Sequence, residues 1–192
     1  MAIYSICFRF IKLSLIIKKF KQMKKSLGAL AVLLIAATAV QAQATATANA
    51  SATIVSPISI SKTTDLNFGN LAVDATGGTV ILDPSMAATR NSAGAGGVTF
   101  PANTGTVSAA AFTVSGQPNF TFDFNVLNPT IQISNGVEIM NVENFTKSVG
   151  AGLLDGAGTQ TVYVGADLIV NGSQAPGIYT SASPFTVLVN YN

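Results

Sequence analysis

Apolar and polar residues alternate along much of the chain, most regularly in 120–126 (Phe-Thr-Phe-Asp-Phe-Asn-Val). The same alternation closes the chain, where Phe185, Val187, Val189 and Tyr191 occupy every second position. Successive side chains of a β-strand point to opposite faces, so each apolar set is expected to lie on one face. The pattern predicts a core-forming strand at both places, with Phe120 pointing inward in the first.

Shorter runs of the same kind, separated by Gly, Pro, Asn and Ser, predict further strands. No helical period is found after Ala42. Many short strands between turns are typical of a sandwich or barrel. We predict one all-β, immunoglobulin-like β-sandwich over 53–192, with a hairpin turn at 134–136 and a loop at 84–97. The other predicted strands are 52–62, 65–71, 79–82, 98–100, 111–115, 131–133, 137–146 and 159–170.

The first 42 residues have the composition of an export signal. Met23-Lys24-Lys25 is followed by an apolar segment over 27–40, and Val40-Gln41-Ala42 supplies small residues at the cleavage-determining positions. We interpret 23–42 as the signal peptide proper and 1–22 as an over-called N-terminal extension. A membrane anchor is the alternative for 1–22, but its apolar runs are short and interrupted by charge. Cleavage after Ala42 predicts a product that is secreted, on the cell surface or periplasmic, with no membrane span.

Removal of this segment reverses the charge of the chain. The precursor carries +2, but seven of its ten basic residues precede residue 26. Three basic residues and eight acidic ones remain, which gives a net charge of −5. No basic patch is left, so nucleic acid is not an expected partner. The only cysteine, Cys7, is also removed, which excludes a disulfide framework.

The mature chain is expected to begin with a leader over 43–52. Alanine fills every second position and a polar residue fills the others. One interpretation is a flexible spacer of low complexity. The other is an extended strand that pairs with something, since Ile54, Ile58 and Ile60 continue the same parity. The candidate donor residues are Ala44, Ala46, Ala48, Ala50 and Ala52.

The sequence offers little material for catalysis. It has no histidine, and the expected mature chain has no cysteine, which excludes His-based triads and Cys/His zinc sites. Its eight acids are scattered at outward strand positions or in turns, without calcium-loop spacing. The glycine run at 94–97 lacks the Lys-Ser/Thr of a phosphate loop. We therefore expect a non-enzymatic protein without catalytic, cofactor or metal sites; the alternative is a hydrolase that uses surface acids.

Several segments together resemble one bacterial exported family, the domain of unknown function numbered 4402. The resemblance spans about 54–192 and implies no activity. It is found in Ile58-Ser-Ile with Asp65-Leu-Asn-Phe-Gly69, in Gly77-Gly-Thr-Val-Ile-Leu-Asp83-Pro84, in Ala111-Phe-Thr-Val-Ser-Gly116, in Val162-Tyr-Val-Gly165 with Asp167-Leu-Ile-Val170, and in Gly177-Ile-Tyr179 with Phe185-Thr-Val-Leu-Val-Asn-Tyr191.

The ending, a glycine before an alternating strand with tyrosine next to last, is also similar to chaperone–usher pilins. Asn67-Phe68-Gly69 and Gly177-Ile-Tyr179 resemble the spore-coat-protein-U type. Such subunits are incomplete immunoglobulin-like sandwiches, completed by a neighbour's N-terminal donor strand. This chain departs from them because it lacks their common disulfide and because its leader offers alanines where donor strands carry bulky residues.

These patterns lead to one expected function and one alternative. We expect an exported surface structural protein, a fimbrial or pilus-like subunit, that self-assembles or meets a periplasmic chaperone and usher. Phe185, Val187, Val189 and Tyr191 then form the candidate assembly strand. The alternative is a free-standing secreted or periplasmic β-sandwich that binds a ligand or an envelope component.

Overall fold

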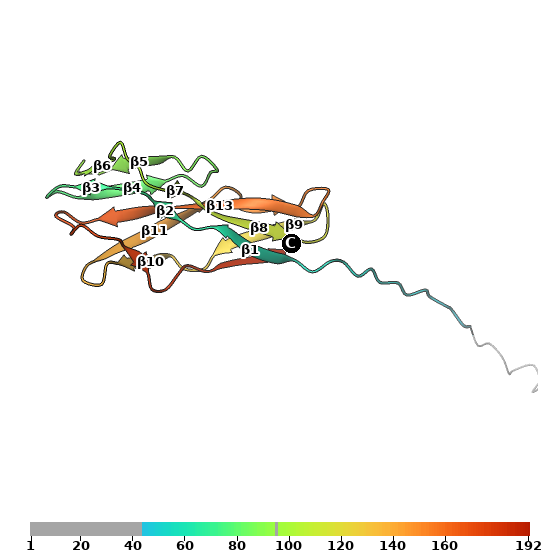
Figure 1. The fold of residues 1–192 in the computed structure, drawn as a ribbon. Coiled ribbons are helices and arrows are strands. Elements are labelled where there is room, and N and C mark those ends of the chain that lie inside the picture. Colours follow the sequence, from blue (N-terminus) through green and yellow to red (C-terminus); the bar gives the residue numbers. More distant parts are fainter. Residues whose placement is uncertain (1–43, 95) are drawn as a thin grey trace, which may run out of the picture. The chain divides into compact units, whose positions relative to one another are not determined.

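The structure is a computed structural model that describes residues 44–94 and 96–192 (Figure 1). The predicted signal peptide lies outside the described residues. Every regular element among those described is a strand, so the all-β prediction is confirmed. The strands are β1 (Ser59–Thr64), β2 (Asn67–Phe68), β3 (Ala72–Val73), β4 (Gly78–Leu82), β5 (Arg90–Ala93), β6 (Val98–Thr99), β7 (Val107–Ser108), β8 (Ala110–Ser115), β9 (Thr121–Val126), β10 (Thr130–Ser134), β11 (Ile139–Lys147), β12 (Ala151–Leu153), β13 (Thr159–Val170), β14 (Thr180–Ser181) and β15 (Val187–Tyr191).

The largest sheet is built around β13, its longest strand. The strand order is β1-β8-β13-β11-β10-β14, and all pairs are antiparallel. Along one edge β13 changes partner: Thr159 to Val164 pair with β8, and Ala166 to Val170 pair with β4, which carries β5 beyond it. One long strand therefore belongs to both halves of the domain.

A second sheet, in the order β12-β9-β15, supplies the other side of one core. Phe122 and Phe124 of β9 are completely buried against apolar residues of β8 and β13. Burial of each such side chain stabilises the fold by roughly 1.5–3 kcal/mol. The facing sheets are consistent with a β-sandwich.

The other half of the domain has its own core. It is formed by inward-facing residues of β4, β11 and the C-terminal half of β13, with Phe68 of β2 and Val98 of β6. The two-stranded pairs β2–β7 and β3–β6 border this half. Leu66 and Phe145 pack against both cores and so join them.

The structure corrects three local predictions. The first strand begins at Ser59 rather than at residue 52, consistent with Pro57, which has no N–H to donate to a ladder. The predicted loop at 84–97 contains β5, which forms by pairing with β4. Phe120 precedes β9 and is 40% exposed, because Asn119 has a φ of 62° and turns the chain just before the strand.

Other predictions agree closely with the structure. β13 has the predicted bounds, and the 134–136 turn joins β10 to β11 as a hairpin. In that turn the side chain of Asn135 accepts hydrogen bonds from the amides of Val137 and Glu138, at 2.9 and 2.8 Å. Gly136 follows with a φ of 94°, a conformation that favours glycine.

The chain divides into two units at Thr53, and the strands all belong to the second unit, residues 53–192. Of the first unit the structure describes residues 44–52, which are exposed and lie in no strand. Within the part of the chain that the structure describes, no helix is long and apolar enough to cross a membrane.

Candidate functional site

The last strand, β15, has an unpaired edge. It pairs with β9 in antiparallel register, from Val187 opposite Val126 to Tyr191 opposite Phe122. Among the described residues no strand pairs with its other edge. β15 therefore ends its sheet, and one row of its backbone groups has no ladder partner.

Two hydrogen bonds identify the residues of that row. The carbonyl of Thr186 accepts from the amide of Leu127 at 2.9 Å, and the amide of Asn192 donates to the carbonyl of Thr121 at 3.3 Å. In an antiparallel pair the direction of the backbone groups alternates along the strand. The even-numbered residues of β15 thus face β9, and the backbone groups of Val187, Val189 and Tyr191 face the open edge.

The side chains of these residues point into the core. Val189 is buried, and Val187 and Tyr191 are half-buried against the same cluster. Phe185, just before the strand, packs its ring 4.8 Å from that of Phe145 and 6.1 Å from that of Phe112. All four candidate assembly residues therefore lie on the core side, while Leu188 points outward and is 43% exposed.

The first strand presents a second open edge to the same core. β1 pairs only with β8 among the described strands, and Ile58 and Ile60 pack half-buried against the cluster that holds Val187 and Tyr191. The amide of Gly116 donates to the carbonyl of Gly158, which turns the even-numbered residues of β8 toward β13 and the odd-numbered ones toward β1. By the same alternation the backbone groups of Ile58 and Ile60 face away from β8.

A tyrosine joins the two edges at one end. The hydroxyl of Tyr191 donates to the carbonyl of Ser56 at 2.8 Å and accepts from the amide of Gln117 at 2.6 Å. The side-chain carbonyl of Gln117 accepts in turn from the amide of Ser56 at 3.1 Å. Phe120 packs edge-on against the ring of Tyr191, with centroids 5.7 Å apart. These four residues hold the start of β1 beside the end of the chain (Figure 1).

The candidate donor residues Ala44, Ala46, Ala48, Ala50 and Ala52 are all exposed and form no strand. The next apolar residue of that parity, Ile54, is 97% exposed. Ile58 and Ile60 share this parity and are half-buried, whereas Ile54 precedes the first strand and packs on no face of the sheet.

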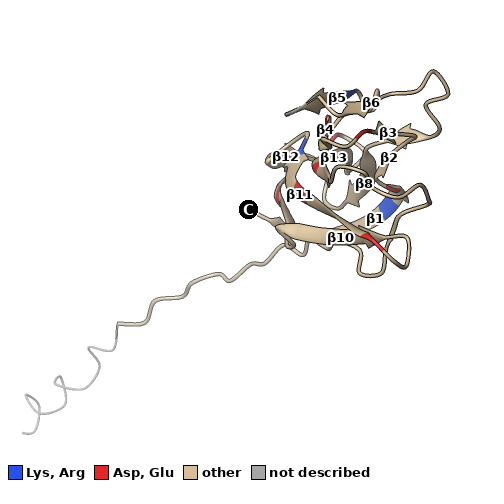
Figure 2. Cartoon of the chain, turned by 90° about the vertical axis from the view of Figure 1, so that its left-hand side faces the viewer, with Lys and Arg blue, Asp and Glu red and all other residues tan. Residues whose placement is uncertain are grey.

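Ionisable side chains are few and scattered over the described part of the chain (Figure 2). The described residues contain no cluster of three or more His, Cys, Asp or Glu side chains that could hold a metal ion. Hydrogen bonds from the Thr159 amide first, and then from the Ala157 amide and the Thr159 hydroxyl, lower the pKa of Asp155 below its ordinary value. This carboxylate is fully exposed in a turn, so its bonds serve local structure.

Another carboxylate organises a loop. Glu138 accepts hydrogen bonds from the amide of Ala175 at 2.7 Å, from the side chain of Gln174 at 2.9 Å and from the hydroxyl of Tyr179 at 3.2 Å. These partners tie the 171–179 loop to the β10–β11 hairpin.

Comparison with known proteins identifies the family. Residues 58–191 match the domain of unknown function DUF4402, and the chain belongs to that family. The match begins at Ile58, at the start of the first open edge, and ends at Tyr191, the last residue of β15. No curated protein and no solved structure matches the chain.

Proposed function

We propose that this protein is a non-enzymatic, exported surface structural protein, a fimbrial or pilus-like subunit that assembles by β-strand complementation. The observation that carries the proposal is the open edge of β15, where the backbone groups of Val187, Val189 and Tyr191 have no partner strand among the described residues. The apolar side chains along this edge, which we call the seam, pack against the core. Unpaired edges of this kind accept a strand from another chain.

The strand order supports an immunoglobulin-like assignment that lacks one strand. In such sandwiches one sheet has the order A-B-E-D and the other has C-F-G. Here β1-β8-β13-β11 corresponds to the first sheet, and β9 and β15 correspond to C and F. The position of strand G, beside β15, has no strand among the described residues. The missing strand and the open edge coincide.

The direction of an incoming strand decides the kind of assembly. β15 runs toward Ser56, where the chain enters its first strand. A donor strand antiparallel to β15 continues into its own domain at the Phe185 end of the seam, whereas the acceptor's own leader starts at the Ser56 end. Each subunit therefore receives a strand and donates one at opposite ends, and the contact repeats as an open polymer. A donor strand parallel to β15 continues into its own domain at the Ser56 end, where the acceptor's own leader also starts. Two copies can then exchange leaders and form a closed dimer. We propose the antiparallel arrangement.

The leader is the proposed donor. Its alternate alanines contribute roughly 4 kcal/mol of apolar burial at about 0.8 kcal/mol each, less than the cost of ordering ten residues at about 1–2 kcal/mol each. Ile54 supplies the bulk that the alanines lack, since it shares their parity and is almost wholly exposed. Ladder hydrogen bonds to β15 supply the remainder. In the cell, a periplasmic chaperone strand can occupy the edge before assembly.

The test fuses a second copy of residues 43–54 to the C-terminus of the 43–192 chain through a short flexible linker. The fused chain should be monomeric and should melt at least roughly 5 °C higher, since 1 kcal/mol corresponds to about 2–4 °C at this size. The matched control carries Ala48→Asp and Ala50→Asp in the added copy, which places charges against the seam. Identical melting of monomeric fused and unfused chains means that the sandwich is complete alone and overturns the proposal.

A further inference from the structure

The outer face of the β1-β8-β13 sheet is almost entirely covered by hydroxyl groups. The inward side chains of these strands, such as Val114 and Val162, are buried, so the alternate residues point outward. At nine register-aligned positions, eight residues carry a hydroxyl and the ninth is Ala111. The aligned rows are Ser59–Ser115–Thr159, Ser61–Thr113–Thr161 and Thr64–Ala111–Tyr163.

The alanine creates a hollow in this face. Its small side chain lies between Tyr163 on one neighbouring strand and Thr63 and Thr64 on the other. The hollow has a volume of about 350 Å³, and its wall is completed by the 83–89 loop, through Met86, and by β7. This volume lies at the small end of the range for ligand sites.

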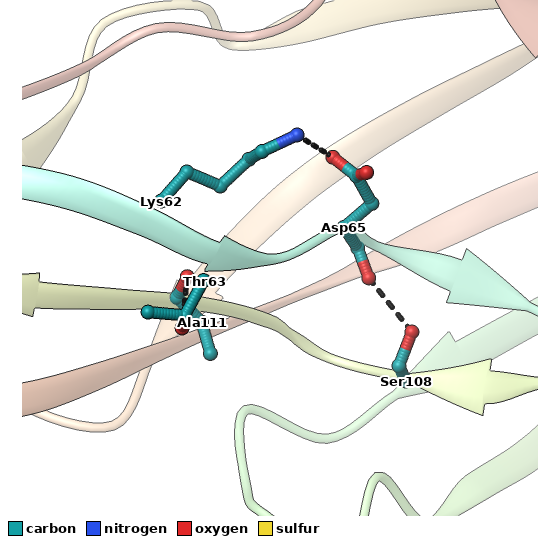
Figure 3. A network of polar contacts seen from close by, with 5 residues as sticks. All are labelled: Lys62, Thr63, Asp65, Ser108 and Ala111. Carbon is teal, nitrogen blue, oxygen red and sulfur yellow. Dashed lines mark hydrogen bonds and ion pairs between the residues drawn. The ribbon is translucent and has the colours of Figure 1, made fainter.

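Several hydroxyls in the hollow are available for a ligand. Four lining hydroxyls make no hydrogen bond to another described residue: those of Thr64, Thr113, Thr161 and Tyr163. Each of these hydroxyls can both donate and accept a hydrogen bond. By contrast, Thr63 donates to the carbonyl of Ala111 at 3.0 Å, and Ser108 donates to that of Asp65 at 2.7 Å (Figure 3). The hollow is therefore lined by both engaged and unengaged hydroxyls.

The electrostatics of the hollow are close to neutral. The lining contains no Asp, Glu, Lys, Arg or His side chain. Lys62 and Asp65, which flank the lining residues Thr63 and Thr64 in sequence, pair with each other (Figure 3). Tyr163 and the largely exposed Met86 add apolar surface between the hydroxyls. A charged ligand gains nothing here, whereas a molecule with many hydroxyls and C–H faces matches both kinds of surface.

We propose that this hollow binds a neutral carbohydrate, with one or two sugar units held between Tyr163 and the threonines of β1, β8 and β13. Hydroxyls of the sugar exchange hydrogen bonds with Thr64, Thr113 and Thr161, and its C–H face packs on Tyr163 and Met86. The inference does not depend on assembly at β15, because the hollow is lined by β1, β7, β8, β13 and the 83–89 loop and by no residue of β9 or β15.

The experiment titrates the ¹⁵N-labelled 43–192 chain with maltohexaose, cellohexaose and mannohexaose, and with oligogalacturonate as the charged comparison. At millimolar sugar, at least one neutral oligosaccharide should shift the amide signals of β8 and β13 around Ala111 and saturate them. Oligogalacturonate should bind no better. No saturable shift with any of the three neutral sugars, or shifts confined to other parts of the domain, overturns the proposal.

Three variants locate the site. Thr113→Val with Thr161→Val removes two hydroxyls at constant shape and should weaken binding roughly tenfold, since two hydrogen bonds are lost. Ala111→Leu fills the hollow and should abolish binding. Thr121→Val, at an exposed position of β9 in the other sheet, is the matched control and should bind normally. Unchanged affinity in a folded Thr113→Val, Thr161→Val variant contradicts the proposal, even if Ala111→Leu does not fold.

Discussion

The hydroxyl of Tyr191, one residue from the end of the chain, donates a hydrogen bond to the carbonyl of Ser56, 135 residues earlier. Through the same oxygen it accepts from the amide of Gln117. The bond fixes the point at which the chain enters its first strand, directly beside the end of the open edge. The Tyr191 side chain thus positions the start of the first strand relative to the open edge of β15.

Tyr191→Phe should destabilise the domain by about 1–2 kcal/mol, because the Gln117 amide and the Ser56 carbonyl each lose a partner. Urea unfolding measures the change, and faster hydrogen exchange at the Gln117 amide should accompany it. Tyr163→Phe is the matched control, since its hydroxyl bonds no described residue, and it should change stability by less than about 0.5 kcal/mol. Equal effects of the two variants would contradict this role for Tyr191.

Arg90 is expected to contribute more to stability than Lys62 does. Its guanidinium donates to the carbonyls of Phe68 and Asn70 and lies 4.4 Å from the ring centroid of Phe100. Burial lowers the pKa of Arg90 from its ordinary value, but an arginine stays protonated in proteins. Arg90→Ala should therefore cost about 2 kcal/mol, read from the urea midpoint.

Lys62→Ala provides the comparison for Arg90→Ala. Lys62 forms an exposed ion pair with Asp65, and such pairs contribute at most about 1 kcal/mol. If Lys62→Ala lowers the free energy of unfolding as much as Arg90→Ala does, the hydrogen bonds from the guanidinium to the carbonyls do not contribute to stability.

Gly165 lies where β13 exchanges β8 for β4, and it allows close approach of the backbone there. A β-carbon at this position would lie 2.0 Å from the carbonyl oxygen of Leu82 and 2.8 Å from the nitrogen of Pro84. Gly165→Ala should cost about 3 kcal/mol or more, or prevent folding, because backbone atoms must move. Gly156→Ala, with no neighbouring atom within 4 Å, should be nearly neutral. A thermal melt of Gly165→Ala that matches the wild type would refute the packing argument.

Asp155 should make stability depend on pH in acid. Its pKa is lowered in the folded chain, so its stabilising effect is fully present above the unfolded value of about 4 and is lost as the pH falls through the folded value. Asp155→Asn should be less stable than the wild type at neutral pH, and the difference should shrink below about pH 4. Thermal melts of both proteins between neutral and strongly acidic pH measure it. A difference that stays constant across that interval would count against the effect.

Side-chain parity makes much of the fold predictable. β13 and β15 combine β-branched residues with alternation, so Phe185, Val189 and Tyr191 can be assigned to the core from their spacing alone. Strands without that pattern are not predicted. β5, with the sequence Arg-Asn-Ser-Ala, carries no apolar alternation and forms because β4 offers it an edge. The inward prediction for Phe120 is wrong because the turn at Asn119 precedes the strand.

The candidate sites are less predictable than the strands. Whether an edge is open depends on which strands meet across long sequence separations, and alternation does not specify neighbours. Part of the hydroxyl-covered face can be predicted from the sequence, since Thr159, Thr161 and Tyr163 occupy alternate positions of one strand and so share a face. Its hollow depends on the register that places Ala111 between Tyr163 and the threonines of β1, and the sequence does not define that register.

The strand shared by both halves of the domain comes late in the chain. β8, β4 and β11 must all wait for β13, whose last residue is Val170, before their edges are covered. During synthesis, β1, β4, β8 and β11 therefore all leave the ribosome before the strand that joins them. Folding should be a single late event dominated by contacts distant in sequence, and such folding is slow. Until β13 has been synthesised, the nascent chain lacks its central strand and is accessible to chaperones that bind unfolded chains.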